Sequence, residues 1–448
     1  MSKTAVVLAL LTVLPLAADE RDAIAERGPL KLSLKRAIEL AVSPEGNPRV
    51  ALQTEAVKQA QDRSRQALGT LLPDVETYVG ATDAVRSLAA QGLTGIELPF
   101  GLKIPQRTPP YHTLDLRATM STPLFDFSLV RRLESSHASV KASKDDLNNV
   151  DDTVVAGVSR AYLTALRADA DVAAAQADVA LAQATKKQSI NQKQAGSGTA
   201  IDVTRSDVEL SNQQQRLLVS KNQQTKAHLQ LLRVMNLRLD TEVELTDKLE
   251  YRPVQTLTVD DAIAQAKANR SDLQAQLKRE DAARLNASAV KYERLPSVIM
   301  QADYGTIGPQ EITLLPTRDL YAAVRIPVFD GGRRDARRAE SYSQLRQEQI
   351  RTADLRDQIE LDVRTAMDSL RSADEQVLVA KEGLRLAESE LQQARRRYDA
   401  GVAIGLEITD ASTRMERART NDIQAVYNYN LSRIDLGQAL GKTASMLD

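Results

Sequence analysis

Two long stretches of the chain repeat apolar residues every three and four positions, as coiled-coil helices do. In the clearer stretch, large apolar residues recur every seven positions with an alanine between them: Val363, Ala366, Leu370, Ala373, Val377, Ala380, Leu384, Ala387, Leu391, Ala394 and Tyr398. The same register returns 205 residues earlier, from Val158 to Ala182, where polar residues interrupt it. At ~1.5 Å per residue, a helix of some 60 residues is a rod of roughly 90 Å, which no compact globule needs.

Four shorter stretches alternate apolar and polar residues, as a strand with two different faces does. They fall at residues 74–82, 113–122, 297–305 and 319–327. Their length suits a tilted strand that crosses an outer membrane. A solvated antiparallel sheet with one buried face gives the same alternation, so the pattern alone leaves both interpretations open.

The sequence contains an internal duplication. Short motifs of the first half return in the same order in the second: Leu72-Pro73 as Leu295-Pro296, Pro123-Leu124-Phe125-Asp126 as Pro327-Val328-Phe329-Asp330, and Ala195-Gly196 as Ala400-Gly401. We therefore predict two repeats, residues 19–250 and 251–448. Each holds a strand pair and a long helical hairpin, at about 132–235 and 337–440. The first repeat also carries a Gly- and Pro-rich insertion at about 84–111, which is typical of a long extracellular loop.

Residues 1–18 are predicted to be a secretory signal peptide. Lys3 precedes an apolar run too short to span a bilayer, and Leu16-Ala17-Ala18 offers a cleavage site. The chain has no cysteine, so it has neither a disulfide framework nor a thiolate site. Its formal net charge of −1 provides no basic excess for binding nucleic acid. Aromatic residues make up only 3%, and tryptophan is absent, which favours long helices over an aromatic-rich globular core.

Four strands cannot close a barrel, and an open sheet edge cannot lie in lipid. If the strands span a membrane, several copies must therefore share one wall. Two copies give eight strands, whose side chains largely fill the interior, whereas three copies give twelve strands and leave a lumen. The trimer is the most economical prediction for a conduit.

Taken together, these motifs make the chain similar to the TolC-like outer-membrane efflux family over nearly its whole predicted mature length. The shared features are the twofold repeat, the Leu-Pro and Pro-x-Phe-Asp motifs around the strands, and the turn Tyr398-Asp399-Ala400-Gly401 followed by Glu407-Ile408-Thr409-Asp410. The resemblance implies a mainly α fold with a small β part. It implies a trimeric α/β barrel in which a twelve-stranded outer-membrane β-barrel continues into a periplasmic helical coiled-coil barrel. It also implies a mixed collar, at about residues 237–256 plus the C-terminal tail.

The function implied by this resemblance is that of a passive outer-membrane exit duct in a tripartite efflux pump or a type I secretion system, and not that of an enzyme. Its implied partners are two further copies of the chain, a periplasmic adaptor protein, an inner-membrane pump and the lipid of the outer membrane. We expect no cofactor, and we do not expect nucleic acid to be a partner. The main alternative is a secreted or periplasmic coiled-coil structural or adaptor protein. The exported substrate and the class of pump cannot be read from the sequence.

The family resemblance also implies a gate at the periplasmic end. Its tyrosine matches Tyr398, the aspartate partner matches Asp202, and the acidic rings match Glu407 and Asp410, whereas an arginine of the best-known member is Ala403 here. Glu407 and Asp410 lie three apart and thus on one helical face, where symmetry would make a ring that attracts cations. The same residues also suit plain structural roles: first-turn acids for Asp202, Glu407 and Asp410, and a last seam position for Tyr398.

The two hairpin turns are the implied docking tips for the adaptor. Their residues are Gly196, Ser197, Gly198, Gly401, Val402 and Ala403. As plain turns between helices, their glycines need no further function. The three histidines, His112, His137 and His228, stand apart without partners at metal-ligand spacing, so we expect neither a metal site nor a catalytic centre.

Overall fold

The computed structural model describes residues 30–43, 46–93, 104–254, 257–309 and 314–443. The predicted signal peptide and the end of the C-terminal tail lie outside these residues. The described chain forms two compact units. Unit 1 consists of residues up to 54, 148–270 and 358 onward, and unit 2 of residues 55–147 and 271–357.

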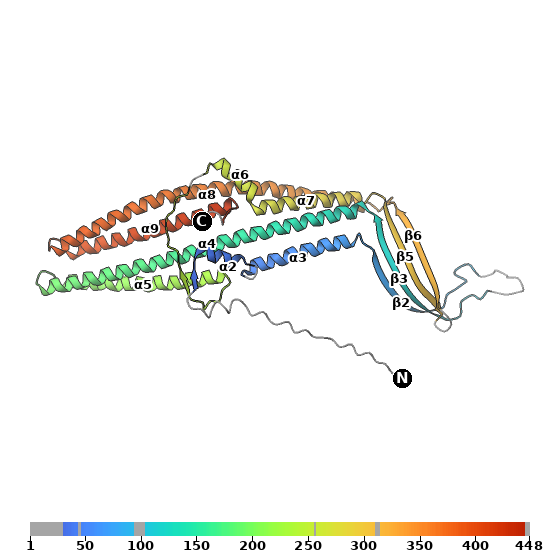
Figure 1. Cartoon of the computed structure of the whole chain (residues 1–448), viewed down its shortest axis with the longest axis horizontal. Coiled ribbons are helices and arrows are strands. Elements are labelled where there is room, and N and C mark those ends of the chain that lie inside the picture. Colours follow the sequence, from blue (N-terminus) through green and yellow to red (C-terminus); the bar gives the residue numbers. More distant parts are fainter. Residues whose placement is uncertain (1–29, 44–45, 94–103, 255–256, 310–313, 444–448) are drawn as a thin grey trace, which may run out of the picture. The chain divides into compact units, whose positions relative to one another are not determined.

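Unit 2 contains a four-stranded antiparallel sheet in the order β2-β3-β5-β6 (Figure 1). The strands are β2 (Asp74–Ala84), β3 (Tyr111–Phe125), β5 (Ser297–Pro309) and β6 (Leu315–Arg325). All four lie where alternation predicted strands, and most extend beyond the predicted ends. The two predicted pairs form a single sheet, because β3 of the first repeat pairs with β5 of the second.

The second strand was predicted to end at residue 122, before Pro123, and this bound is wrong by three residues. β3 continues to Phe125, with a shift in register between Pro123 and Phe125. A proline donates no ladder hydrogen bond, so a strand tolerates it at such an irregularity. The helical residues of this unit belong to α3 (Pro48–Gly69), α7 (Ser271–Tyr292) and the first parts of α4 (Phe127–Gln194) and α8 (Arg333–Asp399).

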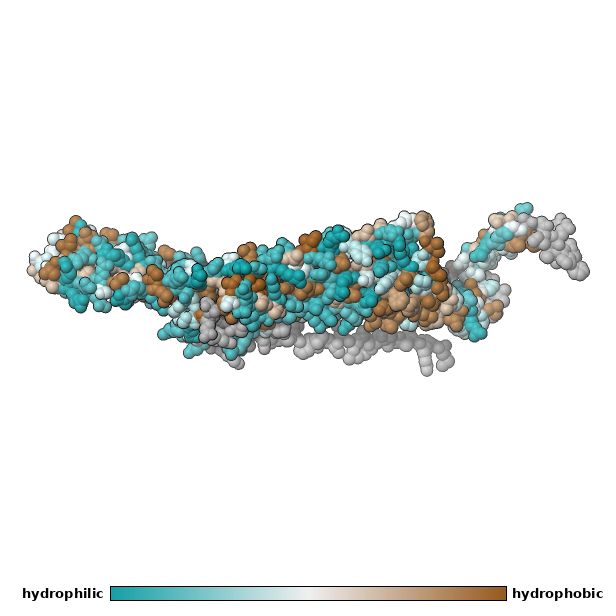
Figure 2. Space-filling view, turned by 90° about the horizontal axis from the view of Figure 1, so that it is seen from above, coloured by the Kyte–Doolittle hydropathy of each residue, from teal (hydrophilic) through white to brown (hydrophobic). Residues whose placement is uncertain are grey.

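The sheet is apolar on one face. Large apolar side chains remain exposed there in the single chain, namely those of Val75, Val79, Leu116, Tyr304, Leu320 and Val324. In Figure 2, hydrophobic side chains gather at the sheet. On the other face, the strand register aligns Glu76, Thr119, Asp303 and Asp319 in one row across all four strands. In the part of the chain that the structure describes, no helix is long and apolar enough to cross a lipid bilayer.

Unit 1 holds the remaining parts of α4 and α8 together with α5 (Ala200–Val234) and α9 (Gly405–Ala439). In this unit the four helices lie side by side in the order α8, α9, α4, α5 (Figure 1). Ion pairs and hydrogen bonds join each neighbouring pair: Glu390 with Arg414, Arg419 with Asp178, and Asp169 with His228. This layer leaves α8 and α5 as its two edges.

The predicted heptad seam of α8 is confirmed. Its residues from Val363 to Tyr398 are buried, except for Ala380 and Leu384, which are partly buried. The matching seam of α4 is likewise buried or partly buried from Val158 to Ala182. An alanine at every second seam position lets the partner backbone approach closely, which explains why these helices need few large side chains to pack.

A small mixed segment of unit 1 lies where we expected the collar. β1 (Leu30–Leu32) pairs in parallel with β4 (Val243–Leu245), and the helices α2 (Leu34–Val42) and α6 (Val259–Asn269) lie nearby in the sequence. The Tyr251 hydroxyl donates a 2.6 Å hydrogen bond to Asp374 of α8, and this bond raises the pKa of Tyr251 to about 12. The Tyr429 hydroxyl binds the backbone of Arg252 and Val254. These contacts tie the segment to α8 and α9.

Candidate functional site: the hairpin tips

The two hairpin turns have the same backbone structure. Gly196 and Gly401 have φ angles of 75° and 72°, in the left-handed region that glycine adopts without strain. In each turn the residue after this glycine donates to a carbonyl five residues earlier, from Ser197 to Gln192 and from Val402 to Arg397. Both helices therefore end in a glycine-capped turn of the Schellman type. The sequence duplication is thus repeated in the local geometry of the tips.

The helices that follow these turns begin differently. At the start of α5, Thr199 and Asp202 form a capping box in which each side chain binds the backbone of the other. The Thr199 hydroxyl also donates to the Asp202 carboxylate over 2.5 Å. α9 begins at Gly405, and its N-cap residue, Ile404, forms no side-chain cap hydrogen bond. A β-carbon on Gly405 would lie 3.3 Å from Asp202 Oδ1, so the two tips meet at Asp202.

Tyr398 lies in the core of the tip and is only 3% exposed. Its ring packs in a cluster with Leu391, Ile408 and Met415. Its hydroxyl is 3.2 Å from Ser189 Oγ of α4 and shares a hydrogen bond with it. The partner of this hydroxyl in the structure is therefore Ser189, and Asp202 is engaged with Thr199. Tyr398 still joins the two hairpins, as a gate residue requires, but through a different residue of the first hairpin.

Glu407 and Asp410 lie in the first turns of α9. The Glu407 carboxylate is 3.0 Å from Arg397 Nε, so its charge is partly balanced by the end of α8. Asp410 is exposed. It interacts electrostatically with Arg414, one turn further along the helix, whose guanidinium binds Glu390. The two predicted gate acids are therefore unequal, because only Asp410 presents a charge that is not directly paired.

Apolar side chains are exposed at both tips. Val402 and Ile404 are 69% and 67% exposed, and Ile201 and Leu406 are also exposed. Ala403, in contrast, packs against the core cluster of the tip. Isolated exposed apolar residues are common, but four of them lie at the ends of two hairpins that meet at Asp202, and such an exposed apolar patch is of the kind that marks contact with a partner.

A layer of charged residues lies along the helices beyond the tips, and the sequence analysis did not predict it. Asp178 of α4 binds Arg419 of α9 over 2.5 Å, and Glu416 of α9 binds both Arg216 and Gln213 of α5. Burial raises the pKa of the Asp178 carboxyl, and the nearby Arg419 and Arg216 offset this effect only in part. The available sequence signal was the buried polar residue Gln213, which interrupts the apolar face of α5. This layer links three helices of both hairpins.

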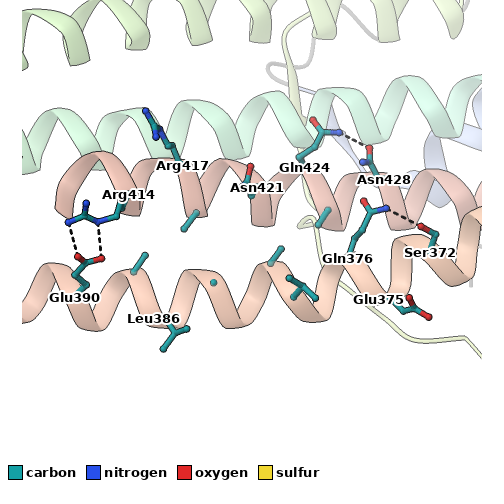
Figure 3. A pocket seen from close by; sticks show the side chains of 16 residues that line it. Ser372, Glu375, Gln376, Leu386, Glu390, Arg414, Arg417, Asn421, Gln424 and Asn428 are labelled. Carbon is teal, nitrogen blue, oxygen red and sulfur yellow. Dashed lines mark hydrogen bonds and ion pairs between the residues drawn. The ribbon is translucent and has the colours of Figure 1, made fainter. Parts of the chain in front are cut away.

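A groove of about 890 Å³ lies between α8 and α9 (Figure 3). Its walls combine small residues with amides and charges, including Gly383, Leu386, Glu375, Asn421 and Gln424. Among the described residues, no group of three or more His, Cys, Asp or Glu side chains is arranged to hold a metal ion.

Comparison with known proteins identifies the class of protein that this fold defines. The structure is similar to that of the open outer-membrane channel MtrE of Neisseria gonorrhoeae, with a TM-score of 0.76 and 16% identity over 92% of this chain and 89% of that one. The CmeC outer-membrane channel of Campylobacter jejuni gives a TM-score of 0.74 with 16% identity, over 92% of this chain and 86% of that chain. The fold is therefore that of the TolC-like channels.

A family model described as "outer membrane efflux protein" matches residues 43–237 and 262–442. The chain belongs to this family and is an efflux channel of the Gram-negative outer membrane, with a large periplasmic extension. The family is one of transport channels and not of enzymes. Among similar sequences, the pyoverdine export outer membrane protein OpmQ of Pseudomonas putida is 23% identical over 86% of this chain and 81% of its own length. The toluene efflux pump outer membrane protein TtgF of Pseudomonas putida is 25% identical over 87% and 79%.

Proposed function

We propose that this chain is one protomer of a homotrimeric exit duct that carries substrates passively from an inner-membrane pump to the exterior. The observation that supports the trimer is the four-stranded sheet of unit 2, which ends in unpaired edges at β2 and β6. Unpaired backbone groups are costly in lipid, so a membrane-spanning sheet of this kind must be closed by other copies. Three copies provide twelve strands, enough to enclose a lumen.

The two faces of the sheet fit the wall of such a barrel. The apolar face, with Val79, Leu320 and Val324 exposed in the single chain, suits contact with lipid. The opposite face carries the aligned row of Glu76, Thr119, Asp303 and Asp319, which suits a water-filled interior. In a trimer, this row becomes a polar belt around the lumen.

The tips are the proposed periplasmic end of the duct, where Asp202, Tyr398, Glu407 and Asp410 form the gate. Supporting this proposal, Tyr398 and Asp202 are each placed where the two hairpins meet. Opening requires that the hairpins separate, which breaks the buried contact between Tyr398 and Ser189. The carboxylates of Glu407 and Asp410 would then line the widened entrance and favour cations.

The proposed partners at this end are a periplasmic adaptor and, through it, an inner-membrane pump that supplies the energy. The exposed apolar patch around Val402 and Ile404 supports an adaptor contact, because an obligate partner would cover it. The relatives include an exporter of pyoverdine and a pump for toluene, so the family serves chemically different substrates. We therefore assign the choice of substrate to the pump.

The test is to purify the protein from outer membranes in mild detergent, measure its mass, and record its conductance in planar lipid bilayers. A homotrimeric duct gives a particle of three chains and discrete conductance steps. A particle of a single chain without conductance would overturn the proposal.

A further inference from the structure

An aromatic cluster marks the end of the apolar face of the sheet, where the strands give way to helices (Figure 1). The strand register places Phe125 in one row with Val298 and Val324 of this face. The ring of Phe125 meets that of Phe127 edge-on, with 4.5 Å between the ring centroids. The ring of Phe127 in turn lies 6.0 Å from that of Tyr292 at the end of α7. The surface proposed to face lipid therefore ends in three aromatic rings.

This cluster lies away from the edges of the sheet. Phe125 belongs to β3 and Tyr292 precedes β5, and these are the two central strands. The proposed neighbouring copies join at β2 and β6, so they do not account for the exposure of Phe125 and Phe127. Aromatic rings at the end of a lipid-facing surface suit the boundary between the hydrocarbon and the headgroups.

Two arginines next to this boundary stack on tyrosine rings. Arg131 of α4 lies over Tyr292, with 5.9 Å from its Cζ atom to the ring centroid, and Arg338 of α8 lies over Tyr342 at 5.6 Å. A guanidinium stacked on a ring still presents N–H donors at its edge, in a fork that matches a phosphate. Both arginines can therefore bind an anion without leaving their rings.

A contact between α7 and α8 links the surroundings of the two arginines. Arg294, two residues after Tyr292, forms an ion pair with Asp335 in the first turn of α8. Asp335, Arg338 and Tyr342 follow one another at spacings of three and four, so they share one side of α8. The two stacked arginines therefore flank the end of α7.

The depth of these arginines matches that of a headgroup layer. Arg131 is the fifth residue of α4 and Arg338 is the sixth of α8, so each lies about 6–8 Å from the start of its helix. The headgroup region on each side of a bilayer is about 5–8 Å thick. An acyl chain on the apolar face therefore leaves its phosphate at the level of the guanidiniums.

The charges at this level favour a lipid that is itself negatively charged. Glu134 binds Arg131 over 2.6 Å, and Asp335 binds Arg294. Within the part of the chain that the structure describes, no carboxylate binds Arg338, so its charge is left over. A net positive charge attracts an anionic headgroup more strongly than a zwitterionic one, whose ammonium group it repels.

We infer that Arg131 and Arg338 bind the phosphates of anionic phospholipids in the periplasm-facing leaflet, with Phe125, Phe127 and Tyr292 beside the upper ends of the acyl chains. This inference rests on the proposed duct and specifies the lipid that its outer surface takes. Phosphates held at one level fix the depth of the protein in the membrane.

The test is native mass spectrometry of the purified protein in mild detergent, titrated with phosphatidylglycerol or with phosphatidylethanolamine of the same acyl chains. We expect the unmodified trimer to bind phosphatidylglycerol about tenfold more tightly. The test variant, Arg131→Gln with Arg338→Gln, should lose this preference. An excess of inorganic phosphate should not displace the lipid, because the acyl chains contribute to its binding.

The control variant, Arg132→Gln with Arg333→Gln, removes the same charge from the same two helix starts. Arg132 and Arg333 are exposed and lie at similar depth, but each points to a different side of its helix from the arginine that it matches. Arg132 binds Glu293, and Arg337 still binds this carboxylate in the control, at 2.7 Å. The control should therefore keep the preference for phosphatidylglycerol.

The outcomes separate this lipid contact from the proposed function. Trimers that conduct but bind both lipids equally, or a control that loses the preference as the test variant does, would overturn the inference and leave the duct intact. Displacement by inorganic phosphate would also overturn it, because the arginines would then form a plain anion site. Single chains without conductance would overturn the duct, and the lipid contact with it.

Fluorescence provides a second test in which both arginines stay in place. The chain has no tryptophan, so Phe127→Trp introduces a single reporter in the aromatic cluster. Brominated phosphatidylglycerol, as a minor component of vesicles, should quench it more than the same fraction of brominated phosphatidylethanolamine. Ile350→Trp is the control, since Ile350 is exposed but lies about 25 Å along α8 from its start and should not be quenched. Equal quenching of the Phe127→Trp reporter by the two lipids would contradict the inference.

Discussion

At the scale of single residues, Tyr398 combines two roles that the sequence left open. Its ring completes the core of the tip, and its hydroxyl reaches Ser189 of the other hairpin. The seam position of Tyr398 was predictable, because the heptad period alone requires an apolar residue there. The partner of its hydroxyl was not, because it depends on how two helices that are distant in the sequence meet. In the sequence, Ser189 was visible only as one of the polar residues that interrupt the heptad pattern of α4.

The two roles of Tyr398 can be separated by mutation. Tyr398→Phe removes one buried hydrogen bond and should destabilise the closed state by about 1 kcal/mol. Tyr398→Ala also empties the cluster and should cost ~3–5 kcal/mol. We expect a modest increase of open-channel probability in planar bilayers for the first variant and a large one for the second. Equal effects of Tyr398→Phe and Tyr398→Ala would mean that the hydroxyl alone holds the gate.

The acids of the gate are predicted to act unequally. Replacing both Glu407 and Asp410 by alanine should lower cation selectivity, measured as the reversal potential in a salt gradient. Arg397→Gln should raise this selectivity, because it frees the Glu407 carboxylate that Arg397 now balances at 3.0 Å. Arg395→Gln, a nearby exposed arginine of α8, serves as the control. If the double alanine variant keeps its selectivity, these acids do not belong to the gate.

At the scale of elements, the strands were predictable because their alternation has a period of two, and one face of each had to be apolar. The pairing of β3 with β5 was not predicted, since no local pattern reports which strands of different repeats lie side by side. The bulge at Pro123 likewise follows from the partner strand. The charged layer around Asp178 escaped notice because its members come from three helices.

Neighbouring residues of β6 test the assignment of the two faces of the sheet. Leu320→Arg places a charge on the apolar face and should cost ~2–4 kcal/mol if it lies near the bilayer midplane. Asp319→Arg, one residue away, changes the polar face and should be tolerated. We expect the yield of assembled protein in outer membranes to fall for the first variant only. Similar yields for both variants would indicate that the sheet does not face lipid.

The layer around Asp178 should make stability depend on pH in a definite direction. The charged groups that face Asp178 are Arg419 of α9 and Arg216 and Glu209 of α5. Since burial raises the pKa of Asp178 above its ordinary value, the folded protein holds this proton more tightly than the unfolded chain. Its contribution to the free energy of unfolding therefore falls as the pH rises through the interval between the two pKa values.

Asp178→Asn removes this titration. Relative to the variant, the wild type should lose stability as the pH is raised across that interval, and denaturant unfolding in detergent on either side of it measures the change. A constant difference between the two proteins, or a gain by the wild type, would show that Asp178 is not held in this way.

At the scale of the whole molecule, the duplication was the decisive sequence signal, because two copies of a unit with long seams and few strands suit few architectures. Composition only excluded alternatives, such as a disulfide framework and nucleic-acid binding. The family resemblance implied the duct and its partners, whereas the edges α5 and α8 became visible only when the order of helices in the layer was known.

Substitutions at the tips should separate conduction by the channel from docking of its partner. Val402→Asp combined with Ile404→Asp places charges in the exposed apolar patch, where an adaptor would have to desolvate them. These side chains are largely free of contacts within the chain, so the purified variant should keep its conductance and trimeric mass. Efflux in cells, measured as accumulation of an exported dye, should be lost. Gln183→Asp, an exposed polar position on α4, controls for added charge and should export normally.

If the double variant still exports, the adaptor binds elsewhere. If its conductance falls as well, the patch belongs to the gate, because a surface used only for docking has no influence on an isolated channel.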